Sequence, residues 1–191
     1  EALTEGLSRR AAILRQLLPV MIGWMGMGAD PDQGLLSFRR LSDAIGTSHW
    51  FMGMLRDSRL VAKRLSYICS GSRWTSDRLS ETPQAVSWLD DDADLQIRPR
   101  EVLAGEVASL LRRRLLGMRS ENYEQVATEA ISTLLAIRSR EQLRSAMADT
   151  LDGVDPLRGA AALSQVTEVV LDGAIRVAHA VAIAQTQGPQ A

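Results

Sequence analysis

The sequence predicts an all-α fold, in which an array of short helices is followed by long antiparallel helices that form a bundle. Aromatic residues make up only 4% of the 191 positions, and a chain rich in Ala, Leu, Arg and Val favours helices over strands. Apolar residues recur at helical spacing along most of the chain. In addition, no stretch alternates apolar and polar residues between turn residues, as a half-buried strand does.

The composition is that of a globular protein, with 46% hydrophobic and 24% charged residues. The net charge of −1 provides no basic field for nucleic acid or an anionic membrane. No apolar run reaches the roughly 18 residues of a membrane span. The single cysteine, Cys69, excludes an internal disulfide, and with no secretory signal we expect a reducing, cytoplasmic location. Because the chain opens at Glu1 inside a predicted helix, we expect it to be part of a longer protein.

Short helices are predicted for residues 1–94. The first covers about residues 3–25, where Pro19 should kink or split it because proline lacks the donor N–H. The stretch GMGADPDQG, residues 26–34, is a loop in which Asp30 caps the next helix and Pro31 occupies its first position. The remaining short helices are punctuated at Gly46, at Thr47 or Ser48, at Asp57-Ser58, at Gly71, at Ser72 or Thr75, and at Pro83.

Long helices are predicted for residues 95–191, near 98–118, 120–150 and 155–186. Pro99 opens the first, which begins with Glu101 and ends with Arg112, Arg113 and Arg114, an order that complements the helix dipole. Ser120 is a plausible cap for the second helix, and DGVDP, residues 152–156, is the turn before the third. We therefore divide the chain into residues 1–94 and 95–191, with one continuous helical domain as the alternative.

Trp50, Trp74 and Trp88 recur with apolar neighbours at helical spacing, so we expect all three to be largely buried among the short helices. Five methionines have the pattern of gap-filling core residues, with an adaptable contact surface as the alternative. They are Met21, Met25, Met27, Met52 and Met54.

A nucleotidyltransferase metal site has a look-alike in the sequence. Gly71-Ser72 precedes an acidic run of Asp90, Asp91, Asp92 and Asp94. Nucleotidyl transfer needs carboxylates fixed on neighbouring strands, where they hold two magnesium ions. No strand is predicted here, and two helices separate the Gly-Ser pair from the aspartates. We therefore interpret residues 90–94 as a solvated acidic linker whose local compensation comes from Arg98 and Arg100.

The other reactive side chains also have structural interpretations. Cys69 lies on an apolar helix face without a nearby histidine, which indicates a buried, inert thiol. We expect His49 to be a partly exposed packing residue, and His179 to be a core or interface residue. The three arginines Arg112, Arg113 and Arg114 fit a helix C-terminus as well as they fit a phosphate site. We therefore predict no catalytic, cofactor-binding or metal-binding residue in this chain.

A series of short motifs resembles the bifunctional glutamine synthetase adenylyltransferase/adenylyl-removing enzyme family, in its actinobacterial form. The resemblance is strongest over residues 7–118. The matching positions are Leu17-Leu18-Pro19, Asp30-Pro31-Asp32, Phe38, Arg40-Leu41, Leu55-Arg56-Asp57, Ser76-Asp77, Leu79 and Pro83.

The resemblance implies an enzyme with two nucleotidyltransferase domains in one chain. One of them adds adenylyl groups to glutamine synthetase from ATP with magnesium, and the other removes them. The present sequence resembles the helical stretch between these domains, leading toward the second, and it lacks the family's catalytic signature. The partners implied are the flanking nucleotidyltransferase domains and glutamine synthetase, with a PII-type signal protein as an optional one.

Two functions follow as hypotheses. The first is a non-catalytic helical linker or regulatory segment of that enzyme, so that ATP and magnesium belong to the parent protein and not to this segment. The alternative is a free-standing helical module for protein interaction or ligand sensing. The sequence on either side of this stretch would distinguish the two hypotheses.

Overall fold

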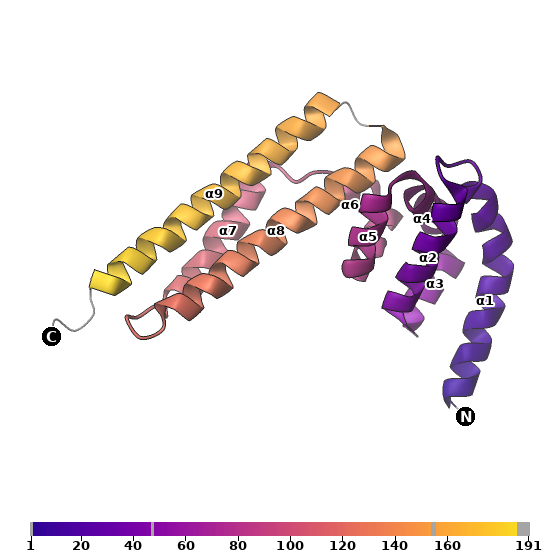
Figure 1. The fold of residues 1–191 in the computed structure, drawn as a ribbon, viewed down its shortest axis with the longest axis horizontal. Coiled ribbons are helices and arrows are strands. Elements are labelled where there is room, and N and C mark those ends of the chain that lie inside the picture. The colour runs from indigo at the N-terminus through magenta and orange to yellow at the C-terminus, as the bar shows by residue number, and fades with distance from the viewer. Residues whose placement is uncertain (1, 47, 154–155, 187–191) are drawn as a thin grey trace. The chain divides into compact units, whose positions relative to one another are not determined.

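The predicted all-α fold is confirmed by a computed structural model that describes residues 2–46, 48–153 and 156–186. Within these ranges every regular element is a helix (Figure 1). Contacts within the chain divide it into two compact units. The first unit comprises residues 1–96 and 146–153, and the second comprises residues 97–145 and 154–191.

The first unit is built around the helix α4, which contacts α1, α2, α3, α5 and η1. Side-chain caps separate these short helices, because Asp30, Ser58 and Ser72 accept hydrogen bonds from the backbone N–H groups that open α2, α4 and α5. The elements are α1 (Ala2–Met25), α2 (Pro31–Ile45), α3 (His49–Asp57), α4 (Arg59–Gly71), α5 (Arg73–Glu81), the 3₁₀ helix η1 (Pro83–Asp90) and α6 (Asp92–Leu95).

Three boundaries of the first unit refine the predictions. Pro19 does not split the first helix, since α1 runs through it to Met25 as one element. Ser48 stands at the start of α3 without a side-chain capping bond, whereas Thr47 lies outside the described residues. Pro83 opens a 3₁₀ helix rather than an α-helix.

Close backbone approach joins α2 to α4. The Asp30 N–H donates to the Ser70 carbonyl at 3.0 Å. A Cβ added at Gly34 would lie 2.9 Å from the Cβ of Ser70. Residue 34 must therefore be glycine, because the absence of a side chain lets α2 pack directly against α4.

Two of the three tryptophan predictions are wrong. Trp50 remains 42% exposed and Trp74 48% exposed, while Trp88 is half-buried. Both residues stand in the first turn of a short helix, Trp50 in α3 and Trp74 in α5. Trp50 lies edge-on to Phe51, and the Arg78 guanidinium lies 5.7 Å from the Trp74 ring centre. Helical spacing predicts that a residue lies on the core side of its helix, but it does not predict whether the ring is buried.

The methionines divide between core and surface. Met21, Met25 and Met52 are buried, Met54 is half-buried and Met27 is exposed. The core interpretation is therefore confirmed for the first three and wrong for Met27, which lies two residues beyond the end of α1.

The second unit contains α7 (Arg100–Leu115), most of α8 (Tyr123–Asp152) and α9 (Pro156–Thr186). The second long helix begins later than predicted because Asn122 closes the preceding turn, accepting from the Arg119 N–H at 2.7 Å and donating to the Gly117 carbonyl at 3.0 Å. The proposed cap at Asp155 lies outside the described residues. All three helices supply the core, which consists of Leu103, Val107, Leu111, Ala130, Leu134, Ile137, Val166, Val169, Val170 and Val177.

Among the helices of the described residues, none is both long and apolar enough to traverse a lipid bilayer.

Candidate functional site

The acidic run is held in ordered structure at the end of η1 and in α6. Asp90 accepts a hydrogen bond from the Ser58 hydroxyl at 2.8 Å. Asp91 caps α6 by accepting from the Ala93 N–H at 2.9 Å. Asp92 pairs with the Arg64 guanidinium, and the side chains of all four aspartates are exposed.

The charge compensation of this run differs from the prediction. Arg64 supplies it for Asp92 and also donates to the Leu89 carbonyl at 2.9 Å, tying α4 to the end of η1. Arg98 and Arg100 instead pair with Glu106, Glu141, Glu168 and Asp172. Residues 90–94 are therefore solvent-exposed, as predicted for a solvated acidic linker, and contacts with α4 hold them at the end of η1 and in α6.

Gly71 and Ser72 end α4 and begin α5. The Ser72 hydroxyl accepts from the Thr75 N–H at 3.2 Å and from the Thr75 hydroxyl at 2.8 Å, so it serves as a helix cap. Over residues 2–46, 48–153 and 156–186, no group of three or more His, Cys, Asp or Glu side chains is placed to hold a metal ion.

Cys69 is buried on the core side of α4, as predicted. Burial raises the pKa of its thiol to about 12, while a hydrogen bond with Ser76 acts in the opposite direction. A nucleophilic cysteine needs the thiolate form at neutral pH. Cys69 therefore packs as a small apolar residue.

Neither histidine lies in a core. His49 is the first residue of α3 and is exposed, and His179 is exposed on α9. The core interpretation of His179 is therefore wrong, because a stripe of alanines around a helix does not show which of its sides is covered. The arginines at the end of α7 are exposed as well, and Arg114 pairs with Glu129 of α8 at 3.0 Å.

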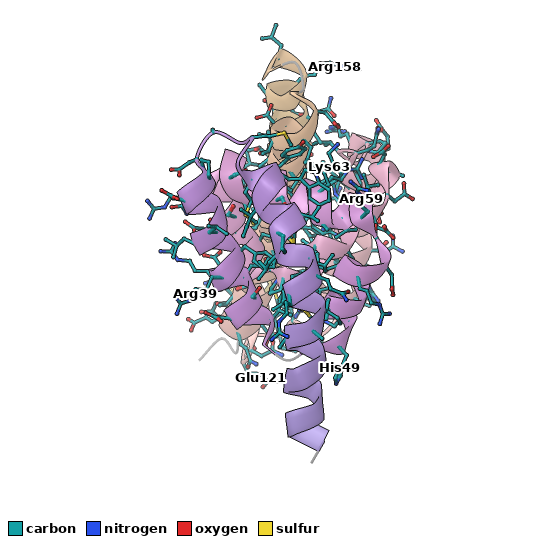
Figure 2. All side chains as sticks on the ribbon, turned by 90° about the vertical axis from the view of Figure 1, so that its right-hand side faces the viewer. Arg39, His49, Arg59, Lys63, Glu121 and Arg158 are labelled. Atoms are coloured by element: carbon teal, nitrogen blue, oxygen red, sulfur yellow. The ribbon has the colours of Figure 1, made fainter. Side chains whose placement is uncertain are left out.

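Two cations on α4 lie against aromatic rings. Arg59 and Lys63 are one turn apart (Figure 2). The Arg59 guanidinium lies 5.5 Å from the centre of the Trp24 ring, and the Lys63 ammonium lies 5.7 Å from that of Tyr67. Such contacts orient the cation while leaving its charge at the surface.

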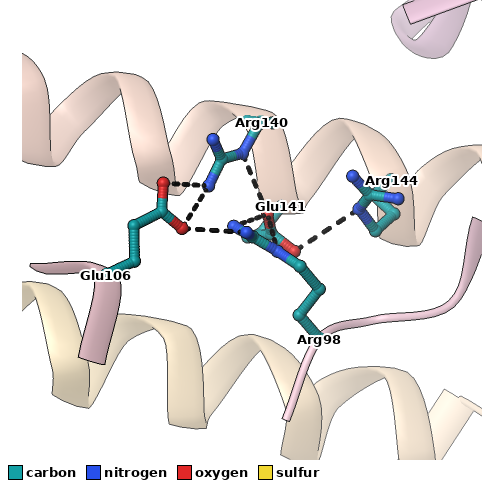
Figure 3. Close-up of polar contacts among 5 residues, drawn as sticks. All are labelled: Arg98, Glu106, Arg140, Glu141 and Arg144. Carbon is teal, nitrogen blue, oxygen red and sulfur yellow. Dashed lines mark hydrogen bonds and ion pairs between the residues drawn. The ribbon is translucent and has the colours of Figure 1, made fainter. Parts of the chain in front are cut away.

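The densest polar arrangement is a five-residue ionic cluster in the second unit (Figure 3). Glu141 of α8 is 0% exposed, and its Oε1 accepts from Arg98 Nη2 at 2.6 Å and from Arg140 Nε at 3.1 Å. Glu106 of α7 accepts from Arg98 at 2.8 Å and from Arg140 at 2.9 Å. Arg144 Nε lies 3.5 Å from Glu141 Oε2.

Two members of the cluster have shifted pKa values, Glu106 and Arg98. Burial alone would raise the pKa of Glu106, but the Arg140 and Arg98 guanidinium groups outweigh it and hold that pKa below its ordinary value. Burial would lower the pKa of Arg98, yet its bonds to Glu141 and Glu106 raise it. Both shifts favour the charged forms, so Glu106 and Arg98 interact as an ion pair.

The cluster connects the start of α7 to the middle of α8. Each of its two carboxylates is already bound by two or more guanidinium groups and is therefore not free to act on a substrate. Its evident chemical capacity is to hold Arg98, just before α7, against α8. Sequence reasoning did not identify this cluster. Its signal was a glutamate on the core stripe of α8, since Glu141 follows Leu134 and Ile137 by seven and four positions.

Comparison with known proteins gives a consistent set of relatives. The sequence profile of the family described as glutamate-ammonia ligase adenylyltransferase matches residues 62–191. The chain is 45% identical over 181 residues to a bifunctional glutamine synthetase adenylyltransferase/adenylyl-removing enzyme of Leifsonia xyli subsp. xyli, covering 93% of this chain and 17% of that protein.

Two further relatives carry the same description. The one from Streptomyces coelicolor is 36% identical over 189 residues, or 92% of this chain and 18% of the relative. The one from Corynebacterium efficiens is 34% identical over 192 residues, or 98% of this chain and 17% of the relative. This chain thus spans about a sixth of the length of its curated relatives. No solved structure matches it significantly.

Proposed function

The chain belongs to the glutamate-ammonia ligase adenylyltransferase family, and from this we propose that it is a non-catalytic helical segment of such an enzyme, which spaces and orients catalytic domains elsewhere in the polypeptide. The observation that carries the proposal is the combination of this family match with an all-helical structure. Within the described residues, three aspartates of the metal-site look-alike, Asp90, Asp91 and Asp92, cap a helix or interact with a neighbouring side chain.

The chemistry of nucleotidyl transfer supports this assignment. The reaction requires rigidly placed carboxylates that hold two metal ions about 4 Å apart, with the nucleotide phosphates bridging those ions. Asp90 and Asp92 lie on consecutive short helical elements at the surface, and Ser72 is committed to capping α5. We therefore assign no catalytic, cofactor-binding or metal-binding residue to this segment.

The parent polypeptide, in this proposal, adenylylates and deadenylylates glutamine synthetase. ATP and magnesium are used by its nucleotidyltransferase domains, and the location is cytoplasmic. Glutamine synthetase is the substrate. A PII-type protein is a candidate regulator that would bind the helical surface of this segment. The exposed cations and tryptophans of the first unit give that surface groups suited to protein contact.

An activity assay of the 191-residue chain tests the proposal. Incubated with ATP, magnesium and glutamine synthetase, the chain should neither hydrolyse ATP nor transfer AMP, while the full-length enzyme does so in parallel. Magnesium-dependent AMP transfer by the purified chain, at a rate proportional to its concentration, would show that the segment contains an active site.

A further inference from the structure

The outer face of α9 carries an apolar row that the bundle leaves uncovered. Leu171 is 57% exposed and Ile175 is 67% exposed, and Ala178 and Ala182 continue the row as exposed residues. The four positions follow one another at intervals of four, three and four residues. At 100° per residue they lie on the side of α9 opposite Val166 and Val177, which face the core.

A helix at the surface of a bundle ordinarily presents polar residues on its solvent side. The 4-3-4 spacing is instead that of a seam where one helix packs against another element. Leu171 and Ile175 are large aliphatic side chains that project from such a seam. Beside them, the small side chains of Ala178 and Ala182 let a neighbouring element approach the backbone of α9. The outer face of α9 therefore has the pattern of a contact surface.

The small size of this face indicates which kind of partner could cover it, a separate protein or a domain of the same chain. A stable contact between separate proteins buries about 800 Å² on each partner and involves about 20–30 residues a side. Four residues on one helix, two of them alanines, fall far short of that. A domain tethered in the same chain has an effective concentration in the millimolar range, so a small apolar contact is enough to hold it.

The relatives show that most of such a polypeptide lies outside this chain, which covers only 17% of the Leifsonia xyli protein. We propose that the row of Leu171, Ile175, Ala178 and Ala182 is a docking face for one of the nucleotidyltransferase domains that flank this segment in the same polypeptide. This rests on the proposed function, since it names the domain contact through which the segment orients its neighbours. The three-helix unit would then hold that domain by an apolar contact opposite its own core.

Cysteine accessibility in the full-length enzyme tests the docking face. Ile175→Cys places a thiol in the row, and Leu116→Cys places one at the end of α7, where the native side chain is 72% exposed. Both sites are exposed in the three-helix unit, so neither change disturbs its core. Native Cys69 gives no background in this segment, because it is buried with a pKa of about 12.

Maleimide labelling is followed at each site by peptide mass spectrometry. We expect the Ile175→Cys variant to react at least about tenfold more slowly than the Leu116→Cys variant, and the two rates to converge in denaturant. Equal native rates would overturn the proposal. So would protection that disappears on dilution together with a dimer seen by light scattering, or protection that arises only when glutamine synthetase is added.

The labelling result is independent of the activity assay. If the isolated chain transferred AMP, the proposed function would fail while the labelling rates still reported whether α9 is covered. If the chain is inactive but the Ile175→Cys site is open, the docking face fails and the assignment of a non-catalytic segment stands.

Discussion

At the residue scale, Glu141 is the side chain at the centre of the ionic cluster in the second unit. It is fully buried, and it interacts with Arg98, Arg140 and Arg144. Removing one member of a buried ionic group leaves the others as uncompensated charges, which costs about 3–5 kcal/mol. We expect Glu141→Ala to lower the free energy of unfolding by that amount in urea denaturation. The exposed Glu121→Ala should change it by less than about 0.5 kcal/mol, and an equal effect of both changes would contradict the account.

Glu106 should make the free energy of unfolding depend on pH in the acidic range. Its pKa is lower in the folded protein than its ordinary value of 4.5, because the arginine contacts outweigh burial. A carboxyl group with a lowered folded pKa stabilises the protein above its unfolded pKa, and that contribution is lost as the pH falls through the folded pKa. The stability difference between the native protein and Glu106→Gln should therefore be present at about pH 7 and shrink below about pH 4.5. Urea titrations at several pH values measure it, and a difference that grows in acid would contradict the pairing.

Cys69 should be chemically silent while the protein is folded. With a pKa of about 12 and a buried side chain, almost none of it is thiolate at neutral pH, and the thiolate is the reactive form. Iodoacetamide should modify it only after denaturation, as followed by intact mass. Rapid alkylation of the native protein would show that the α4 core opens to solvent.

At the scale of elements, the contact between α2 and α4 depends on Gly34. An alanine Cβ there would lie 2.9 Å from the Ser70 Cβ and 3.3 Å from the Ser70 Cα, which belongs to the backbone and cannot rotate away. Gly34→Ala should therefore cost about 1–3 kcal/mol through overpacking. The control is Gly53→Ala in α3, where an added Cβ meets nothing within 4 Å, so it should stabilise the protein by about 0.5–1 kcal/mol. Thermal unfolding of the two variants compares them, and shifts of the same sign would refute the packing argument.

The elements themselves were largely predictable, since helix caps and turns depend on residues close in sequence. Asp30 with Pro31, Ser58 and Ser72 each start a helix where the pattern predicts one. Burial was less predictable, as Trp50 and Trp74 show, because it depends on which elements cover a given turn. The ionic cluster was missed because Arg98 and Glu141 are 43 positions apart. Glu141 on the core stripe of α8 was a local signal of a buried charge, but no local pattern identified its partner.

At the scale of the whole molecule, family membership and the structure of the segment lead to separate conclusions. The family match relates the chain to proteins described as bifunctional glutamine synthetase adenylyltransferase/adenylyl-removing enzymes. Within the described residues, the conspicuous polar groups instead support helix ends and the contacts between helices. We therefore propose that catalysis belongs to other parts of the polypeptide and that this segment spaces and orients them.

The most direct test of that claim is the double change Asp90→Asn and Asp92→Asn in the full-length enzyme. Neither carboxylate is needed to bind metal in this account, and the ion pair of Arg64 with Asp92, whose side chain is 80% exposed, adds about 1 kcal/mol of stability. The rate of magnesium-dependent AMP transfer to glutamine synthetase should therefore stay within about threefold of the native rate, a barrier change below about 1 kcal/mol. Loss of transfer in a variant that keeps the native circular dichroism spectrum and melting temperature would show that these aspartates are catalytic, and would contradict the account.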